Sequence, residues 1–410
     1  MLTRLGHRPH LLLTIPVLTS VVFFGEIPVR SQSSDAPPIA PFTIRVSDDV
    51  LTDLQTRLDV TRFPDEITDS DWDYGTNMTY LRELVEYWQH DYDWRIHEQR
   101  LNEWDHFTTN IDGLNIHFIH QRSAHDGAMP LLLLNGWPSS IDEYARVVGP
   151  LTDPVAFGGT ADQAFHVVIP AMPGYGFSDK PRERGFDPRR MSEFWVTLMS
   201  RLGYDRYGIH ASDWGSAVAN WVARTDSDRI VGLHLIGCEG VLRRAVPVGR
   251  PAHMEADGFG YYEIQGTKTQ TVGVGLNDSP VGLAAWILEK YHGWSDHDGD
   301  IEQAYTKDEL LTNIMIYWVT NSITSASRLY YENRHSPNRP EEALTVPTGC
   351  AGFVERYDRR TRTDDQARPD AERRYNIVRW TEMPRGGHFP ALEEPELWLD
   401  DVRAFFAELR

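Results

Sequence analysis

The chain has 410 residues, of which 41% are hydrophobic and 24% are charged, a composition typical of a soluble globular protein and too apolar for a disordered one. Its 60 acidic residues outnumber 40 basic ones, and the net charge of −20 argues against a nucleic-acid-binding protein, which needs a basic face. The same charge argues against docking on an anionic membrane through a polybasic patch.

The amino terminus differs from the rest of the chain. Residues 11–25 carry no charge and follow a segment that contains Arg4 and Arg8. As a helix they would span about 22 Å, which is less than the ~30 Å apolar core of a bilayer. Length and flanks favour a secretory signal over a membrane anchor, and a wrongly assigned start is the third alternative. We therefore expect a secreted or membrane-associated protein, with residues 11–25 as the membrane contact, or a cytoplasmic protein if the start is wrong.

A linker follows this segment. Residues 31–41 are polar and rich in proline, which indicates a linker and places the start of the folded protein near Pro41. The spacing of apolar residues then predicts helices over residues 48–60 and 77–92. Further along, short apolar runs predict strands, and amphipathic stretches between them predict helices. The strands are expected at residues 114–120, 131–134, 166–169, 207–210 and 231–236, and the helices at residues 191–202 and 216–224.

This alternation predicts βαβ units, which build an α/β fold with a parallel sheet and helices on both faces. The alternation ends after Gly237, where a long helix-like and loop-like stretch begins. Strand-like runs return at residues 343–346 and 376–380, and an amphipathic helix is expected over residues 394–409. The sequence therefore predicts one sheet domain with a helical insertion that overhangs the ligand-binding edge of the sheet.

Both cysteines, Cys238 and Cys350, lie at the ends of apolar strand-like runs. Two cysteines exclude a disulfide framework and a cysteine-rich zinc site. One disulfide between them is an open alternative, but two separate, small, buried hydrophobic residues are favoured.

A carboxylate stands where a nucleophile is expected. Residues 211–215 (ASDWG) have the layout small–x–nucleophile–x–small between a predicted strand and a predicted helix, as in a nucleophile elbow. A carboxylate at Asp213 is poorly suited to attack an ester or an amide, but it can displace at the sp³ carbon of an epoxide or alkyl halide and form an enzyme ester. The alternative interpretation is that Asp213 caps the helix that begins near Ser216.

Two further motifs fit this chemistry. Residues 384–390 (PRGGHFP) place His388 after the last predicted strand, and a late histidine in this chain order suits a base that activates water. Residues 134–138 (LNGWP) follow an early strand, where hydrolases of this type place a backbone oxyanion donor. The amide groups of Trp137 and Trp214 are therefore candidate oxyanion donors, although an ordinary strand-to-loop turn would explain the second motif alone.

With these motifs the chain resembles the microsomal-type epoxide hydrolases, from about Pro41 to its carboxyl terminus. The similarity is carried by residues 92–95 (YDWR), 101–102 (LN), 111–118 (IDGLNIHF), 173–178 (PGYGFS) and, most specifically, 271–290 (TVGVGLNDSPVGLAAWILEK). The resemblance implies an α/β-hydrolase sheet with a helical lid and an amino-terminal arm. The expected divisions are a signal- or anchor-like segment with linker (1–40), the arm (41–100), the core (101–240 and 342–410) and the lid (241–341).

The resemblance also implies two lid tyrosines that donate hydrogen bonds to the epoxide oxygen. The local patterns place them at Tyr261 and Tyr330, with the neighbours Tyr262 and Tyr331 as alternatives. The chemistry needs such donors because an alkoxide is a poor leaving group in a dry pocket, and a phenol with a pKa near ~10 can share a proton there.

The chain departs from the family pattern at two places. At the first, Asn135 stands where the family has histidine, and we expect a changed pocket shape instead of lost chemistry.

The second departure concerns the acid that orients the base histidine and stabilises its imidazolium form. In the family this acid follows the segment matched here by residues 347–353 (PTGCAGF), but the direct register places Arg356 at its position. Glu355 is our candidate for the acid, with Asp358 and Glu239 as alternatives.

The predicted function is hydrolysis of a small apolar epoxide to a vicinal diol through an ester on Asp213, in detoxification or secondary metabolism. No cofactor and no metal are expected, because the chain has no metal-ligand spacing such as His-Glu-x-x-His. One alternative is a dehalogenase with an aspartate nucleophile, which would need halide-stabilising donors where this chain has the tyrosine pair. The other is a non-hydrolytic protein that binds an apolar ligand or steers a cyclisation. No oligomeric state is predicted.

Overall fold

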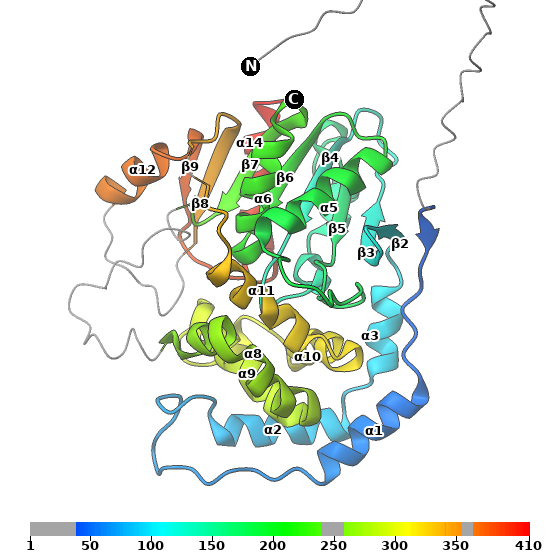
Figure 1. Cartoon of the computed structure of the whole chain (residues 1–410), viewed down its shortest axis with the longest axis vertical. Helices are drawn as coiled ribbons and strands as arrows, with labels where there is room; N and C mark the ends of the chain where they lie inside the picture. Colours follow the sequence, from blue (N-terminus) through cyan, green and yellow to red (C-terminus); the bar gives the residue numbers. More distant parts are fainter. Residues whose placement is uncertain (1–37, 239–257, 341, 354–363) are drawn as a thin grey trace, which may run out of the picture. The chain divides into compact units, whose positions relative to one another are not determined.

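The computed structural model describes residues 38–238, 258–340, 342–353 and 364–410. At its centre is a nine-stranded sheet with the order β1-β2-β3-β5-β4-β6-β7-β8-β9 (Figure 1). The strands are β1 (Ala40–Pro41), β2 (His106–Ile111), β3 (Leu114–Gln121), β4 (Met129–Leu134), β5 (Phe165–Pro170), β6 (Tyr207–Ala211), β7 (Ile230–Ile236), β8 (Pro347–Gly352) and β9 (Asn376–Glu382).

The sheet is mixed, and this corrects the predicted all-parallel sheet at one edge. From β5 to β9 every neighbouring pair is parallel, as predicted, whereas β1, β2 and β3 pair antiparallel with their neighbours. Strand β2 was not predicted because its sequence, HFTTNI, contains no apolar run. The parallel part carries the site, since the carboxyl ends of its strands meet at one edge.

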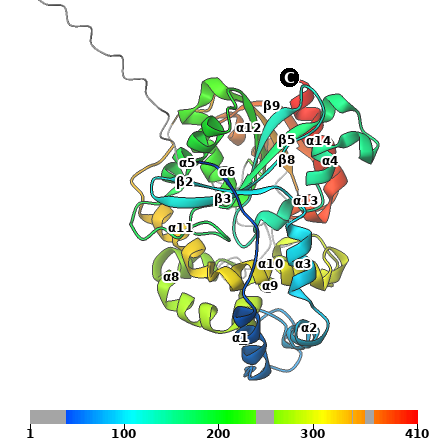
Figure 2. The same ribbon diagram turned by 90° about the vertical axis from the view of Figure 1, so that its right-hand side faces the viewer.

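Helices cover both faces of the sheet. The helices among the described residues are α1 (Asp48–Asp59), α2 (Met78–His90), α3 (Trp94–Leu101), α4 (Val148–Thr152), α5 (Pro188–Arg201), α6 (Asp213–Thr225), α8 (Gly260–Asp278), α9 (Pro280–Trp294), α10 (Lys307–Thr320), α11 (Ile323–His335), α12 (Asp364–Glu372), α13 (Pro390–Glu393) and α14 (Pro395–Ala407). Helices α5 and α6 lie over one face and α14 lies over the other (Figures 1 and 2). None of the helices among the described residues is long and apolar enough to cross a membrane.

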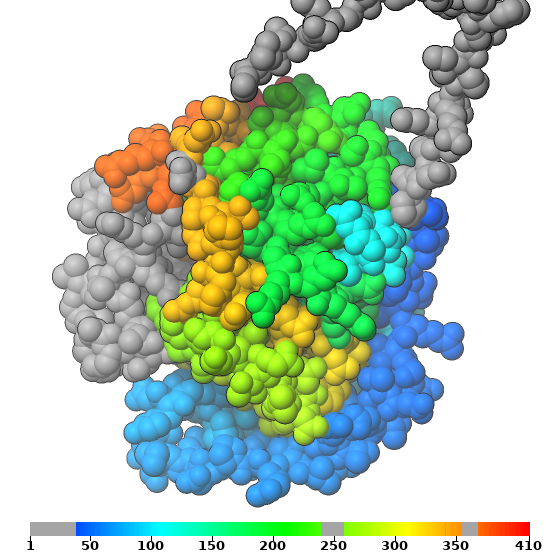
Figure 3. Space-filling model, viewed as in Figure 1, coloured from blue at the N-terminus to red at the C-terminus, as the bar shows by residue number. Residues whose placement is uncertain are grey.

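Helices α8 to α11 follow β7 in the chain and lie at one end of the sheet, and we call them the lid segment (Figures 1 and 2). Helices α1 and α2 contact α9 from the side away from the sheet, and in the space-filling view their blue residues border the yellow-green lid segment (Figure 3). Arg57 Nη1 donates to Asp278 O at 2.6 Å, and Thr76 Oγ1 donates to Ala285 O at 2.6 Å. These bonds fix the amino-terminal helices to the lid segment, while the domain boundaries given above stay predictions.

Strand β8 begins later than predicted. The strand expected at residues 343–346 is wrong, since the paired residues are Pro347–Gly352. The sequence of β8, PTGCAG, contains only small side chains after its proline, because helix α14 fills the space beside it. A Cβ atom added at Gly349 would lie 2.7 Å from Cδ2 of Phe405. Only small residues fit beside α14, and because they form no run of large apolar side chains, the sequence pattern does not predict this strand.

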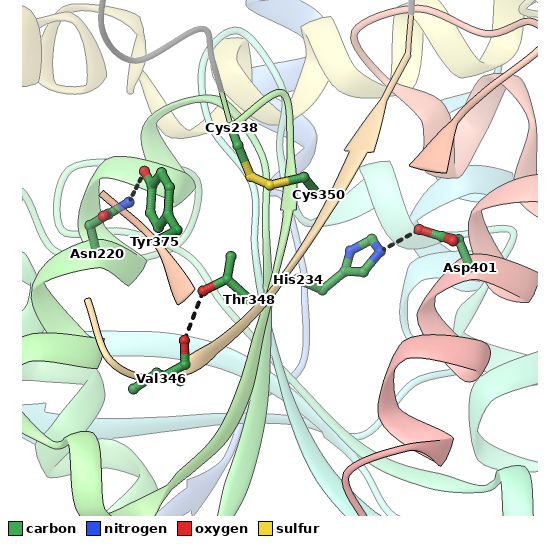
Figure 4. Close-up of a disulfide and its surroundings, with 8 residues drawn as sticks. All are labelled: Asn220, His234, Cys238, Val346, Thr348, Cys350, Tyr375 and Asp401. Atoms are coloured by element: carbon green, nitrogen blue, oxygen red, sulfur yellow. Dashed lines mark hydrogen bonds and ion pairs between the residues drawn. A yellow bond between two sulfur atoms is a disulfide. The ribbon is translucent and has the colours of Figure 1, made fainter. Parts of the chain in front are cut away.

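Cys238 and Cys350 form a disulfide, so the prediction of two separate buried thiols is wrong (Figure 4). Cys238 follows β7, and Cys350 lies in β8, which pairs in parallel with β7. This pairing brings the two Cα atoms to 5.7 Å, a usual separation for a disulfide. The disulfide joins residues far apart in the chain, so the residues around each cysteine do not predict it.

Removing this disulfide is expected to lower the stability of the protein. The bond closes a loop with a sequence separation of 112 residues, and in the chain-entropy model a loop of this length contributes about 4 to 5 kcal/mol. The double variant Cys238→Ala/Cys350→Ala should therefore unfold at a clearly lower urea concentration than the wild type. Dithiothreitol should lower the wild-type midpoint and leave the variant unchanged. Superimposable unfolding curves for the two proteins would contradict the prediction.

A buried chain of hydrogen bonds ties β6, the strand before Asp213, to α14. Trp398 Nε1 donates to His210 Nε2 at 3.1 Å, so the His210 ring carries its proton on Nδ1 and donates it to His234 Nδ1 at 2.9 Å. His234 Nε2 donates in turn to Asp401 Oδ2 at 3.0 Å (Figure 4). Burial lowers the pKa of His210 well below its usual value, which keeps the ring neutral and the order of donors intact.

Candidate active site

Asp213 stands on a tight turn between β6 and α6. Its φ angle is +46°, in the left-handed region, and α6 begins at this residue, earlier than the predicted start at Ser216. Two glycines make room for the turn. A Cβ atom at Gly136 would lie 2.0 Å from Asp213 Oδ1, and one at Gly215 would lie 2.1 Å from the carbonyl oxygen of Leu134. Strand and helix approach so closely here that only residues without side chains fit.

The Asp213 carboxylate faces the loop after β4. The Trp137 amide donates to Asp213 Oδ1 at 2.9 Å, so one of the two predicted oxyanion donors is in place beside the carboxylate. The N-cap position of α6 is occupied by Ser212, which makes no side-chain capping bond, so the interpretation of Asp213 as the helix cap is wrong. The role of the Trp214 amide stays a prediction, and the Trp214 ring packs edge-on against Tyr330 with centroids 4.8 Å apart.

His388 lies next to Asp213. Its Nε2 is 3.5 Å from Asp213 Oδ2, and the two side chains are 15% and 19% exposed, so both are largely shielded from solvent. The ring also packs against Trp294, with centroids 4.8 Å apart, and the His388 amide donates to the carbonyl oxygen of Trp294 at 2.9 Å. This position allows Nε2 to take a proton from water near the carboxyl carbon of Asp213.

A half-buried glutamate that the sequence analysis missed holds the histidine loop. Glu393 Oε2 accepts from the amide of Gly387 at 2.9 Å, and Oε1 accepts from the amide of Phe389 at 2.8 Å. Burial raises the pKa of Glu393 to about 7, although these hydrogen bonds favour its ionised form. The acid orients the loop from both sides of His388 without contacting Asp213. No local pattern distinguishes it from the other glutamates of the segment 393–396.

The three candidates for the acid that orients the His388 ring are Glu355, Asp358 and Glu239. All of them lie outside the described residues. The choice of Glu355 therefore stays a prediction.

The two predicted tyrosines come together in the lid segment. Tyr261 on α8 and Tyr330 on α11 have ring centroids 5.8 Å apart, and both rings contact Trp137, at 5.3 and 5.8 Å. Tyr331 instead stacks on His335 at 4.0 Å, which favours Tyr330 over its neighbour. Lys290, a further residue not predicted, places Nζ 4.3 Å above the Tyr261 ring.

Tyr330 is 1% exposed. Burial raises its pKa well above the usual value, and the negative charge of Asp213 acts in the same direction. The hydroxyl thus keeps its proton at neutral pH. The ring lies against Trp137, whose amide donates to the Asp213 carboxylate.

A cavity lies beside the site, between the loops after β4 and β5 and helix α10. Its wall is mainly apolar, with Met172, Phe177 and Ile316, and it includes Tyr175. Asn135 lines it too and donates from Nδ2 to the carbonyl oxygen of Gly136 at 3.3 Å. The side chain at position 135 thus shapes the cavity wall. Among the described residues, no group of three or more His, Cys, Asp or Glu side chains could hold a metal ion.

Comparison with known protein families gives matches along most of the chain. Residues 39–144 match the family model described as "Epoxide hydrolase N terminus", and residues 129–254 match the model described as "alpha/beta hydrolase fold". A putative epoxide hydrolase of Stigmatella aurantiaca is 41% identical, covering 91% of this chain and 86% of its own length. Epoxide hydrolase 1 of Sus scrofa is 35% identical, covering 93% and 91%.

The structure is also similar to solved structures of epoxide hydrolases. The crystal structure of juvenile hormone epoxide hydrolase from the silkworm Bombyx mori has a TM-score of 0.80 at 32% identity, and the match covers 91% of this chain and 94% of that one. The structure of Aspergillus niger epoxide hydrolase has a TM-score of 0.77 at 29% identity, with coverages of 92% and 98%. The similarity therefore extends over most of both chains in each pair.

Proposed function

The chain belongs to the microsomal-type epoxide hydrolase family, and we propose that it hydrolyses an epoxide to a vicinal diol through an ester formed on Asp213. The observation that carries the proposal is the carboxylate at the elbow. Its Oδ1 accepts the Trp137 amide proton at 2.9 Å, and its Oδ2 lies 3.5 Å from His388 Nε2. A carboxylate in this position suits attack on a strained sp³ carbon, since the resulting ester can then be hydrolysed.

In the first half-reaction, an Asp213 oxygen attacks an epoxide carbon and the ring C–O bond breaks. Tyr261 and Tyr330 donate hydrogen bonds to the departing oxygen, and one phenol transfers its proton to it. The phenolate then regains a proton from solvent. The raised pKa of Tyr330 supports this role, because a phenol that stays protonated at neutral pH is available as a donor.

In the second half-reaction, water attacks the ester carbonyl carbon while His388 takes a proton from that water. The negative charge on the carbonyl oxygen is stabilised by the amides of Trp137 and Trp214, and one donor of this kind typically contributes about 2.7–4 kcal/mol. The bond to the diol oxygen breaks, and the proton on His388 passes to the diol. The carboxylic acid left on Asp213 then releases its proton to solvent, which regenerates the carboxylate. Glu355 is the proposed acid behind His388.

We propose a small apolar epoxide as the substrate. The apolar lining of the cavity by Met172, Phe177 and Ile316 supports this class, because such walls exclude charged substituents. Detoxification and secondary metabolism are the proposed settings, since both present apolar epoxides to a hydrolase.

We propose a secreted or membrane-associated location, with residues 11–25 as the signal or membrane contact. The disulfide between Cys238 and Cys350 supports export, because such bonds form and persist in oxidising compartments.

The experiment that tests the mechanism is a single turnover in H₂¹⁸O with enzyme in excess over styrene oxide, an aryl epoxide. The mechanism predicts an unlabelled diol, because its new oxygen comes from Asp213. The isotope should appear in the peptide that contains Asp213, and the peptide that contains Asp187 serves as the control that stays unlabelled. Label in the diol on the first turnover would show direct attack of water on the epoxide and would overturn the proposal.

A further inference from the structure

A second carboxylate lies buried beside the reaction centre. Glu143 is part of the 3₁₀ helix η1 (Ile141–Tyr144), which continues the loop that carries the Trp137 amide. It is 3% exposed, and its Oε1 accepts a hydrogen bond at 3.2 Å from the hydroxyl of Ser212, the residue before Asp213. The carboxylate is therefore attached to both loops that build the elbow, and no step of the mechanism above uses it.

Three phenols and two charged groups from different elements face Glu143. The phenols are Tyr144 on η1, Tyr291 on α9 and Tyr317 on α10, and the charged groups are Asp213 on α6 and His388 after β9. Burial raises the pKa of each phenol well above its usual value, so the phenols contribute no charge. Among these groups, Asp213 and His388 are the ones whose charge acts on Glu143.

These two groups act in opposite directions. Burial raises the pKa of Glu143 to about 7, while hydrogen bonds from Ser139 and Ser212 lower it. A positively charged His388 also lowers the pKa, and the negative charge of Asp213 raises it. With a pKa of about 7, Glu143 has both its protonated and its ionised form populated near neutral pH.

The charges on both groups change during the proposed reaction. Ester formation removes the negative charge of Asp213, and the attack of water places a positive charge on His388. Each change favours the ionised form of Glu143, whose proton is released to solvent. Because the coupling between two titrating groups is reciprocal, ionised Glu143 stabilises the imidazolium form of His388 to the same extent.

We propose that Glu143 is a positioning residue for the second half-reaction, which ionises when Asp213 is esterified and makes His388 a stronger base toward the attacking water. The inference rests on the ester mechanism proposed above. An opposite charge close to a titrating group typically shifts its pKa by about 1–3 units. We therefore expect ionised Glu143 to accelerate ester hydrolysis about tenfold, with no comparable effect on ester formation.

The test compares wild type with Glu143→Gln, which keeps the side-chain length and an oxygen that accepts from Ser212. Each protein is mixed with styrene oxide and quenched in acid at short times, and intact-mass spectrometry then follows the ester from formation to decay. Ester formation should agree within about threefold. The ratio of wild-type to variant decay rates should be near one at low pH, where Glu143 is protonated, and should rise about tenfold at higher pH. The midpoint of this rise should lie below pH 7, because esterification removes the Asp213 charge that raises the pKa of Glu143.

Two further variants test whether a slower ester decay comes only from a disturbed structure. Asp142→Asn removes a neighbouring carboxylate that is also 3% exposed but pairs with Arg100, at 2.9 Å. Its decay rate should follow that of the wild type at every pH, whatever its stability. Ser212→Ala removes a hydrogen bond that favours ionised Glu143, so the midpoint of its decay profile should move to higher pH, and this variant carries the test if Glu143→Gln does not fold.

The outcomes separate the two proposals. A decay ratio that stays constant with pH, or an equal loss in both half-reactions, would overturn the role of Glu143 and leave the ester mechanism standing. Diol formation without any ester on Asp213 in any variant would overturn the mechanism and the inference together.

Discussion

Replacing Asp213 by asparagine is expected to lower kcat at least about 10⁴-fold, a loss typical of removing a nucleophile. The amide is a far weaker nucleophile than the carboxylate, so no ester forms. The fold should survive, because asparagine tolerates the left-handed conformation at φ +46° and keeps an oxygen that accepts from the Trp137 amide. Diol formation from styrene oxide and the thermal unfolding midpoint are the two measurements.

Asp187→Asn is the matched control for this loss. Asp187 caps helix α5 by accepting from the amide of Arg190 at 2.9 Å, which is the role that the alternative interpretation gave to Asp213. An asparagine cap functions as well, so turnover should stay at the wild-type level. A protein that only binds an apolar ligand would keep its affinity in Asp213→Asn, and residual turnover above about a tenth of the wild-type rate would exclude Asp213 as the nucleophile.

The variant His388→Gln is expected to stop the reaction at the ester. Ester formation needs Asp213 and the lid phenols, whereas hydrolysis of the ester needs a base, and loss of a general base typically costs about 10²–10⁴-fold. After incubation with styrene oxide, the intact mass should rise by one molecule of the epoxide. Peptide mapping should place the addition on Asp213, and the double variant Asp213→Asn/His388→Gln should show none.

A second histidine variant controls for nonspecific alkylation. His335 is exposed at the end of α11, and its ring stacks on Tyr331. His335→Gln should therefore turn over like the wild type and accumulate no ester. Turnover of His388→Gln at the wild-type rate would show that another group activates the water.

The sequence predicted the parallel part of the sheet because its central strands are continuous buried apolar runs, such as LLLL at the end of β4. The sequence did not predict the strands whose residue types are set by contacts with other parts of the fold. Strand β2 is polar, and β8 is built of small residues because Phe405 of α14 occupies the adjacent space. The disulfide was missed for a related reason, since Cys238 and Cys350 meet only when β7 and β8 pair.

The site residues fall into the same two groups, those that the sequence predicted and those that it did not. Asp213, His388 and Trp137 were predicted because each belongs to a short motif at a strand end, and the structure brings these three together. Glu143 and Glu393 carry no such motif. Both are distinguished only by contacts with residues far away in the chain, such as those of Glu143 with Ser212 and of Glu393 with the amide of Asp296.

The disulfide has a consequence for how the lid segment can change. The lid segment leaves the sheet after β7 and returns at β8, and these two strands are paired neighbours joined by a covalent bond. The pairing of β7 with β8 and the disulfide therefore hold the two ends of the lid segment next to each other, whatever the sequence between these strands. We therefore expect that lid segments of different length or sequence can be exchanged at this point with little effect on the position of Asp213, which would give evolution and protein engineering a route to new substrate ranges.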